Sequence, residues 1–158
     1  MRAVVQRVTR AQVTVLDAPS PTGASGPVAG RIGPGLLVYA AAAPDDGDDD
    51  IRYVVDKVTN LRIFRDADDK MNRSVRDIGG AVLLVSAFTV QADARKGRRP
   101  SFDASASGPV AEPLIERLVT ALRDTGIPVE TGRFGAYMRV EAENDGPICI
   151  LLDSRRIF

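Results

Sequence analysis

Residues 81–102 read AVLLVSAFTVQADARKGRRPSF. The apolar run Ala81–Val85 leads into hydroxyl and aromatic residues, and then into four cations around one glycine. A short continuous apolar run predicts a buried strand, and we place the central strand of the fold over Ala81–Thr89. A buried strand that ends in hydroxyl groups beside a basic loop suits an anionic substrate whose reactive group lies near a phosphate.

The composition is that of an ordinary globular protein. The chain has 158 residues, of which 44% are hydrophobic and 27% are charged. This length suits one domain, over residues 1–158, with a substantial buried core. Because 21 cations balance 21 anions, the net charge is zero, and any affinity for nucleic acid must come from a local basic patch.

Neither a membrane span nor a secretory leader is expected. The longest apolar run, residues 36–43, is far shorter than the roughly 20 residues that a transmembrane helix needs. Residues 1–7, MRAVVQR, lack the apolar segment of a signal peptide. Cys149 is the single cysteine, so it cannot form an internal disulfide. Together these features predict a cytoplasmic protein.

The hydrophobic pattern predicts an α/β fold with much antiparallel pairing. Two amphipathic patterns, beginning near Ile51 and Val110, predict helices, and Pro113 is expected in the first turn of the second one. The expected strands cover residues 4–8, 13–15, 27–32, 36–43, 61–64, 81–89, 129–140 and 147–152.

Two segments between these elements are read as structural. Residues 18–26, APSPTGASG, predict a flexible hairpin loop without chemistry. Residues 44–50, PDDGDDD, do not have the spacing of an EF-hand calcium loop. We therefore favour helix capping over metal binding there, because acidic groups stabilise the first turn of a helix.

The absence of histidine narrows the chemistry. Without it, Ser-His-Asp and Cys-His catalytic arrangements are excluded, and a single cysteine cannot complete a zinc site. No Walker or Rossmann glycine pattern is present. We expect neither a metal nor another cofactor. A hydrolase built from this chain must use backbone donors, hydroxyl groups or its own substrate.

Four segments could carry chemistry, and each also has a purely structural interpretation. The hydroxyls of Ser86–Thr89 can satisfy local backbone groups, and the cations of Arg95–Arg99 can form a solvated face or contact phosphates. The two glycines of Thr131–Met138 allow close approach of a ligand or partner chain, or a simple bulge. Asn144–Pro147 reads as a hairpin turn because it contains Asp-Gly.

The same segments resemble the motifs of one family. SAFTVQADARKGRRPSF, residues 86–102, resembles the Ser-Gln-x-Thr strand and KGRRPSF loop of the D-aminoacyl-tRNA deacylases. ENDGPICILL, residues 143–152, resembles their Asn-x-Gly-Pro-Val-Thr motif. MRAVVQRV, IGPGLLV, LRIF, DKMN and TGRFGAYM match in the same order, so the resemblance covers Met1 to about Ser154. It implies a homodimeric α/β fold with a barrel-like core and two main helices.

The resemblance also implies a reaction. Members of this family hydrolyse the ester that joins a D-amino acid to the 3′ end of tRNA, and they accept glycine, including glycine mischarged on tRNA-Ala. Their pocket lies at the dimer interface. Their Gly-Pro bond, here Gly146–Pro147, is cis and projects carbonyl groups into the site of the other subunit. An L-amino acid would drive its side chain into these carbonyls, which is specificity by rejection.

Further residue roles follow from the resemblance. The expected catalytic residues are Ser86, Phe88 and Thr89. The N–H groups near Phe88 and Thr89 are expected to stabilise the oxyanion, and Thr89 is expected to act by its position and not as a nucleophile. The loop residues expected to bind tRNA are Arg95, Lys96, Arg98 and Arg99. The expected pocket wall consists of Arg7, Ala87, Phe134, Gly135, Ala136, Met138 and Cys149.

The sequence departs from the family pattern at two of these positions. Ala87 stands where the family usually has glutamine, and Cys149 stands where it usually has threonine. The loss of the glutamine leaves an alternative open, a dimer that binds the 3′ end of tRNA without turnover. A structural homodimer with an incidental basic loop is a further alternative.

Overall fold

The computed structural model describes residues 1–16 and 26–157, and the predicted loop over residues 18–26 lies almost entirely outside them. The described strands are β1 (Arg2–Leu16), β2 (Val28–Ile32), β3 (Gly35–Ala41), β4 (Phe64–Arg65), β5 (Met71–Arg73), β6 (Ala81–Ser86), β7 (Val129–Thr131) and β8 (Tyr137–Asp153). The helices are α1 (Asp48–Asn60), α2 (Gly108–Arg123) and the 3-10 helix η1 (Phe88–Gln91). None of the described helices is long and apolar enough to cross a membrane.

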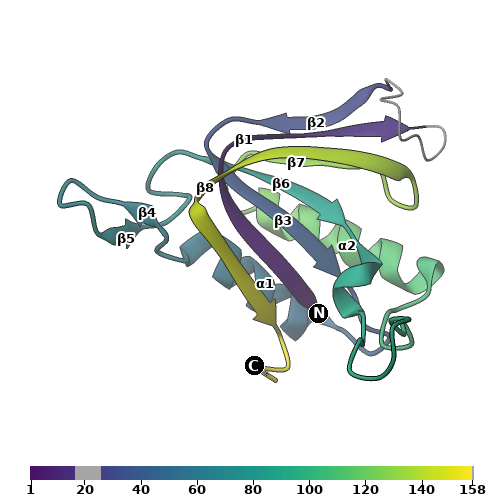
Figure 1. Cartoon of the computed structure of the whole chain (residues 1–158). Coiled ribbons are helices and arrows are strands. Elements are labelled where there is room, and N and C mark those ends of the chain that lie inside the picture. Colours follow the sequence, from purple (N-terminus) through teal and green to yellow (C-terminus); the bar gives the residue numbers. More distant parts are fainter. Residues whose placement is uncertain (17–25, 158) are drawn as a thin grey trace.

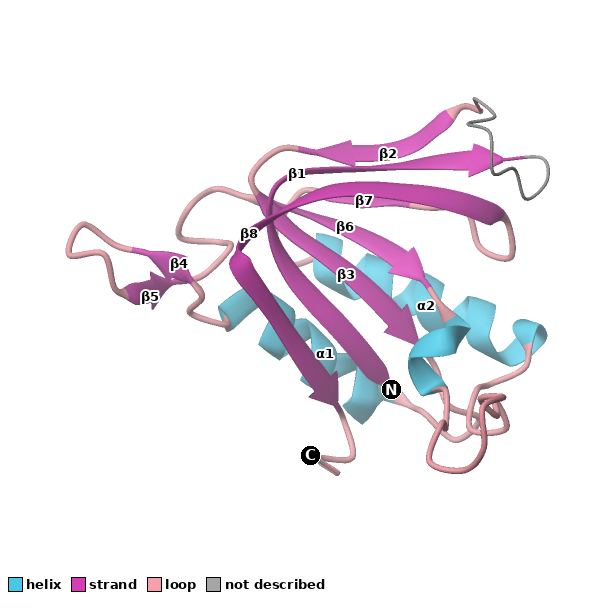
Figure 2. Ribbon diagram, in the orientation of Figure 1, coloured by secondary structure: helices cyan, strands magenta, loops and turns pink. Residues whose placement is uncertain are grey.

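One curved sheet organises the chain (Figures 1 and 2). Its order is β2-β1-β3-β6-β7, and β8 pairs with the other edge of β1. The pairs β3–β6 and β6–β7 are parallel, whereas every pair that β1 makes is antiparallel. The sheet curls until β2 approaches β7, and a Cβ atom on Gly30 would lie 2.8 Å from the carbonyl oxygen of Thr131. Only glycine permits this close approach of the two strands. The nearly closed sheet confirms the predicted α/β fold with a barrel-like core.

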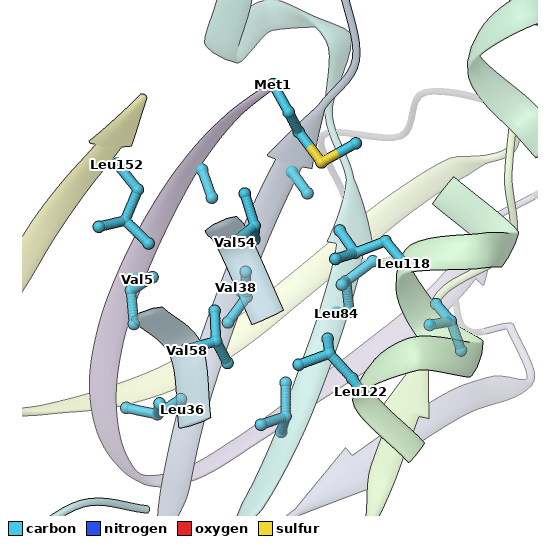
Figure 3. Packing of buried hydrophobic residues seen from close by; sticks show 14 of the residues in the cluster. Met1, Val5, Leu36, Val38, Val54, Val58, Leu84, Leu118, Leu122 and Leu152 are labelled. Carbon is cyan, nitrogen blue, oxygen red and sulfur yellow. The ribbon is translucent and has the colours of Figure 1, made fainter. Parts of the chain in front are cut away.

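Both helices cover one face of this sheet (Figure 1). Their apolar stripes meet the buried side chains of the strands, and Figure 3 shows Val54 and Val58 of α1 and Leu118 and Leu122 of α2 in this core. Leu84 of β6 belongs to this core and is 1% exposed. Each such side chain contributes about 1.5–3 kcal/mol when fully buried. The core therefore fixes the ends of β3 and β6, where the chain turns outward.

The acidic segment at the start of α1 caps the helix, as its pattern predicts. Asp48, Asp49 and Asp50 occupy the first helical turn. The carboxylate of Asp50 accepts a hydrogen bond from the backbone N–H of Gly47 at 2.8 Å. An acidic group at this end satisfies a free donor and meets the positive end of the helix dipole.

The predicted central strand over Ala81–Thr89 is too long. β6 ends at Ser86, and the N–H of Ala87 donates the last bond of the pair to the carbonyl of Ala40. Because β3 ends one residue after Ala40, the chain has no further strand to pair with. It folds instead into η1, Phe88–Gln91.

Other strand boundaries also differ from the prediction. The strands expected over residues 4–8 and 13–15 are one strand, β1, because partners on both of its edges carry the pairing through the middle. The strand expected over residues 129–140 is interrupted, and its second part joins the one expected over residues 147–152 to form β8.

The hairpin turn predicted over residues 144–147 is wrong. The chain does not reverse there, because both halves of β8 pair with the same strand. Asn144 lies opposite Val8, and Cys149 lies opposite Gln6, so four residues of β8 face one residue of β1. The intervening residues form a large bulge, which we call the 145–148 bulge.

Two smaller expectations are also corrected. Pro113 lies inside α2, because the helix begins at Gly108 and places Pro109 in its first turn. The strand expected over residues 61–64 is reduced to β4, which pairs with β5 in a separate hairpin. Figure 1 shows this hairpin projecting from the body of the molecule.

Candidate active site

A cleft of about 730 Å³ opens where β6 ends. The end of β6, η1, the start of α2 and the start of β8 form its walls. The sequence-predicted residues that line it are Ser86, Ala87, Phe88, Thr89, Phe134, Gly135, Ala136 and Met138. The fold thus brings together two segments that are almost fifty residues apart in the sequence.

The described residues of the cleft include no charged side chain. Two tyrosines, Tyr39 and Tyr137, line it, and burial raises the pKa of the Tyr39 hydroxyl above its ordinary value. The remaining polar side chains are the hydroxyls of Ser86, Thr89 and Ser105. Because the described lining residues include no carboxylate, imidazole or amine that could act as a general base, chemistry in this cleft would depend on backbone donors and hydroxyl groups.

Two backbone donors at the rim of the cleft have no acceptor. The N–H groups of Phe88 and Thr89 donate to no group within the described chain, because they open η1 and no helical turn precedes them. The next N–H, that of Val90, already bonds to the carbonyl of Ala87 at 3.0 Å. Two adjacent free donors beside a cleft can bind an oxygen atom that develops negative charge.

The basic loop, residues 94–100, lies outside the cleft, but residues on both sides of it in the sequence line the cleft. The backbones of Asp93 and Ser101 exchange hydrogen bonds of 2.8 and 2.9 Å, which clip the loop at its base. The residues on either side of this clip, Thr89 and Phe102, line the cleft. The loop is therefore an extension of the cleft wall.

Not all four cations of the loop are equally available. The Arg95 guanidinium forms a forked ion pair with Asp93, with Nη2 and Oδ2 2.6 Å apart. The Arg95 side chain and backbone N–H hold the pKa of Asp93 well below its usual range. Lys96, Arg98 and Arg99 are exposed and have no ion-pair partner among the described residues. These three remain free for an anionic ligand.

The Gly146–Pro147 peptide bond is cis and lies in the 145–148 bulge. Both residues are exposed, and Gly146 has a φ of 128°, a conformation that strongly favours glycine. Neither residue lines the cleft of its own chain, and neither do Arg7 and Cys149. These four predicted site residues form a second, separate group.

The buried side chain of Arg7 supports the 145–148 bulge. Its side chain is nearly fully buried, and Nη1 donates to the carbonyl of Ile63 at 2.5 Å. Its Nε lies 2.8 Å from a carboxylate oxygen of Asp145 but lacks hydrogen-bond alignment, so we treat this contact as a charge pair. The side-chain amide of Asn144 donates to the carbonyls of Arg7 and Ile148, at 3.3 and 2.9 Å. The bulge is therefore fixed from both of its ends.

Sequence reasoning missed several residues of these two groups. The cleft is also lined by Tyr39, Phe102, Ser105, Ala111 and Tyr137. The contacts of Asn144 and Asp145 with Arg7 were also missed, because they join positions more than 130 residues apart. Phe102, Tyr137, Asn144 and Asp145 lie in segments that the sequence analysis singled out, whereas Tyr39, Ser105 and Ala111 do not.

The model of the D-Tyr-tRNA(Tyr) deacylase family matches residues 4–153. The chain belongs to this family. Among the family's curated members, the D-aminoacyl-tRNA deacylase of Syntrophobacter fumaroxidans is 51% identical over 158 residues and is covered, like this chain, over 100% of its length. The corresponding protein of Anaeromyxobacter dehalogenans is 52% identical over 158 residues, again with 100% of both chains covered.

Solved structures agree with this family assignment. A c-Myc DNA unwinding element binding protein is 38% identical, with a TM-score of 0.87 over 97% of this chain and 98% of its own. A probable eukaryotic D-amino acid tRNA deacylase is 18% identical, with a TM-score of 0.75 over 96% of this chain and 97% of its own. The second similarity supports the deacylase fold alone.

Replacement of Arg7 by alanine tests the brace under the bulge. We expect the free energy of unfolding to fall by about 2–4 kcal/mol, because the change removes a buried donor, an ion pair and a packed side chain. Arg10→Ala is the matched control, since the exposed pair of Arg10 with Glu143 on the same two strands is worth less than about 1 kcal/mol. Urea unfolding measures both, and equal losses would contradict the assignment.

Proposed function

We propose that the protein hydrolyses the ester bond between a D-amino acid and the 3′ end of tRNA. Membership of the deacylase family supports this reaction. The observation that carries it is the pair of free N–H groups of Phe88 and Thr89 beside a cleft without charged side chains. The proposed task is to remove wrongly charged amino acids from tRNA in the cytoplasm.

In the proposed reaction, the ester carbonyl oxygen points at the N–H groups of Phe88 and Thr89. Water adds to the carbonyl carbon, and the two donors stabilise the oxyanion by about 3–4 kcal/mol each. The bond to the ribose 3′ oxygen then breaks, and the proton lost by the water goes to that oxygen. The products are the free amino acid and tRNA. An aminoacyl ester is already activated, so backbone donors assisted by the terminal 2′-OH of the tRNA suffice.

Within this mechanism, the side chains of Ser86 and Thr89 act by position. Both hydroxyls line the cleft, but no base lies beside them to make either a nucleophile. Phe134, Gly135, Ala136 and Met138 form the opposite wall, which confines the ester.

We propose that chiral selection requires a second copy of the chain. Gly146 and Pro147 are exposed and lie outside their own cleft, so their carbonyls are available to a neighbour. Pro147 of the partner subunit would then complete the cleft as a stiff wall. The side chain of an L-amino acid meets this wall and that of a D-amino acid points away, whereas glycine has no side chain to exclude. The same logic admits glycine mischarged on tRNA-Ala.

The outer edge of β8 supports a homodimer. Among the described strands only β1 pairs with β8, which leaves a long edge with free backbone groups. Tyr137 and Leu151 of this strand are more than half exposed. Exposed apolar residues along an unpaired edge are typical of an interface between subunits.

The two departures from the family pattern have different consequences. Ala87 lines the cleft, so the missing glutamine removes a polar group from the site itself. This observation keeps the alternative function, a dimer that binds the 3′ end of tRNA without turnover. Cys149 is exposed and, like Gly146 and Pro147, lies outside the cleft of its own chain, so its predicted part in the pocket would be in the cleft of a partner subunit.

Incubation with D-Tyr-tRNA, L-Tyr-tRNA and Gly-tRNA tests the proposal. We expect rapid loss of the D-tyrosyl and glycyl esters, while the L-tyrosyl ester decays at its rate in buffer. Binding of all three without hydrolysis would establish the alternative function, and hydrolysis of the D and L esters at equal rates would overturn the proposed chiral selection.

Thr89→Val tests whether the backbone or the hydroxyl does the chemistry. We expect kcat to fall less than about tenfold, since an oxyanion donor on the backbone survives this change whereas a lost nucleophile costs several orders of magnitude. The measurement is single-turnover hydrolysis of D-Tyr-tRNA by both proteins. Isolation of an acyl ester on Thr89 of the unchanged protein would rule out the backbone mechanism.

The salt dependence of tRNA binding tests the loop. If Lys96, Arg98 and Arg99 contact phosphates, the log of the affinity should fall with the log of salt concentration by about 0.7 per contact, or roughly 2 in total. The triple alanine variant should lose this part of the slope. Arg52→Ala, which removes an exposed cation that is paired with Asp49 on α1, is the control and should leave the slope unchanged.

A further inference from the structure

Two phenylalanine rings lie exposed at the rim of the cleft. Phe88 is 56% exposed and Phe102 is 37% exposed, although a phenylalanine side chain gains about 1.5–3 kcal/mol when it is fully buried. The mechanism proposed above uses the backbone of Phe88 but neither ring. An exposed pair of large apolar side chains at a binding site indicates a surface that a ligand covers.

The two rings hold each other in place. Their centroids are 5.1 Å apart and their planes meet at 72°, which is the favourable edge-to-face arrangement. Phe88 is also fixed by its position at the start of η1, and Phe102 by the Asp93–Ser101 clip directly before it. The aromatic pair is therefore ordered before any ligand arrives, which lowers the entropy cost of binding to it.

The pair lies between the free backbone donors and the free cations. Phe88 itself carries one of the N–H groups proposed to bind the oxyanion. On the other side, Arg99 is three residues before Phe102, so their Cα atoms are within about 11 Å of each other. The rings therefore lie close to any ligand that spans the cleft and the loop.

Aromatic faces next to unpaired cations are the arrangement that binds single-stranded nucleic acid. The cations attract the phosphates, and the rings stack on bases of any sequence. An acidic peptide would satisfy the cations of Lys96, Arg98 and Arg99 but would leave the rings uncovered. A nucleotide chain satisfies both features of the surface.

We propose that Phe102, held by its edge-to-face contact with Phe88, stacks on a nucleobase of the unpaired 3′ end of tRNA, while Lys96, Arg98 and Arg99 contact the phosphates that precede it. The identity of the RNA rests on the proposed function. Phe102 is then a positioning residue for the substrate. It anchors the 3′ end of the RNA, so that the terminal ribose ester is held at the cleft.

Fluorescence of 2-aminopurine tests the stacking directly. The probe is a short single-stranded RNA ending in CCA, with 2-aminopurine at the last position in one version and at the next to last in another. We expect quenching in one of the two complexes with the unchanged protein and with Phe102→Tyr, which keeps the ring. Phe102→Leu keeps the apolar volume but should lose the quenching and bind about 5- to 150-fold more weakly.

Val110→Ala is the matched control, because it trims an exposed apolar side chain of α2 that has no ring. It should leave both quenching and affinity unchanged. Thermal unfolding of each variant shows that the fold is kept, as expected for side chains that are partly exposed. Absence of quenching at both positions, or equal affinity of Phe102→Leu and the unchanged protein, overturns the inference.

Deacylation kinetics separate this inference from the proposed function. Phe102→Leu should raise KM for D-Tyr-tRNA by a similar factor and leave kcat nearly unchanged. Hydrolysis of the ester without quenching of any base leaves the proposed function standing and removes the inference. Quenching without hydrolysis supports the inference and contradicts the proposed function. If Phe102→Leu instead lowers the mass found by sedimentation and leaves RNA affinity unchanged, a second copy of the chain covers the rings and the inference is wrong.

Discussion

The pairing of β1 along both of its edges is the constraint on which the molecule depends. One edge of β1 is shared by β3 and β2, and the other edge belongs entirely to β8. Because β8 follows β1 over almost its whole length, a local loss of register cannot be relieved by a reversal of the chain. It is relieved by the 145–148 bulge, which carries the exposed Gly146–Pro147 unit. The feature proposed to select the amino acid is thus a direct result of the longest pairing in the sheet.

The second consequence of the sheet is the place of the cleft. β6 loses its partner when β3 ends, and the chain turns at once into η1. The donors of Phe88 and Thr89 are free for this reason. The described lining of the cleft holds no charged side chain beside these donors. The catalysis proposed for these donors requires rigidity, and the buried core behind β3 and β6 supplies it.

Much of the fold and part of the candidate site were predictable from the sequence. Apolar runs marked β3 and β6, the acidic segment marked the start of α1, and the KGRRPSF loop marked one edge of the cleft. The strand end at Ser86 was not predictable, because it depends on where a different strand stops. The bulge was read as a turn, since Asp145-Gly146 has the local signature of one. Likewise, the contacts of Arg7 with Ile63 and Asp145 and the exposure of Phe102 depend on tertiary packing that no local pattern contains.

The Asp93–Ser101 clip separates two parts of the molecule that are proposed to bind one substrate. Below the clip, η1 and Phe102 belong to the packed wall of the cleft. Above it, residues 94–100 are exposed, and the hydrogen bonds that they form within the described part of the chain reach no further than Asp93. Changes of length or charge in that segment therefore need not disturb the proposed hydrolytic centre. The preference for particular RNA molecules can diversify during evolution while the chemistry remains under separate, stricter selection.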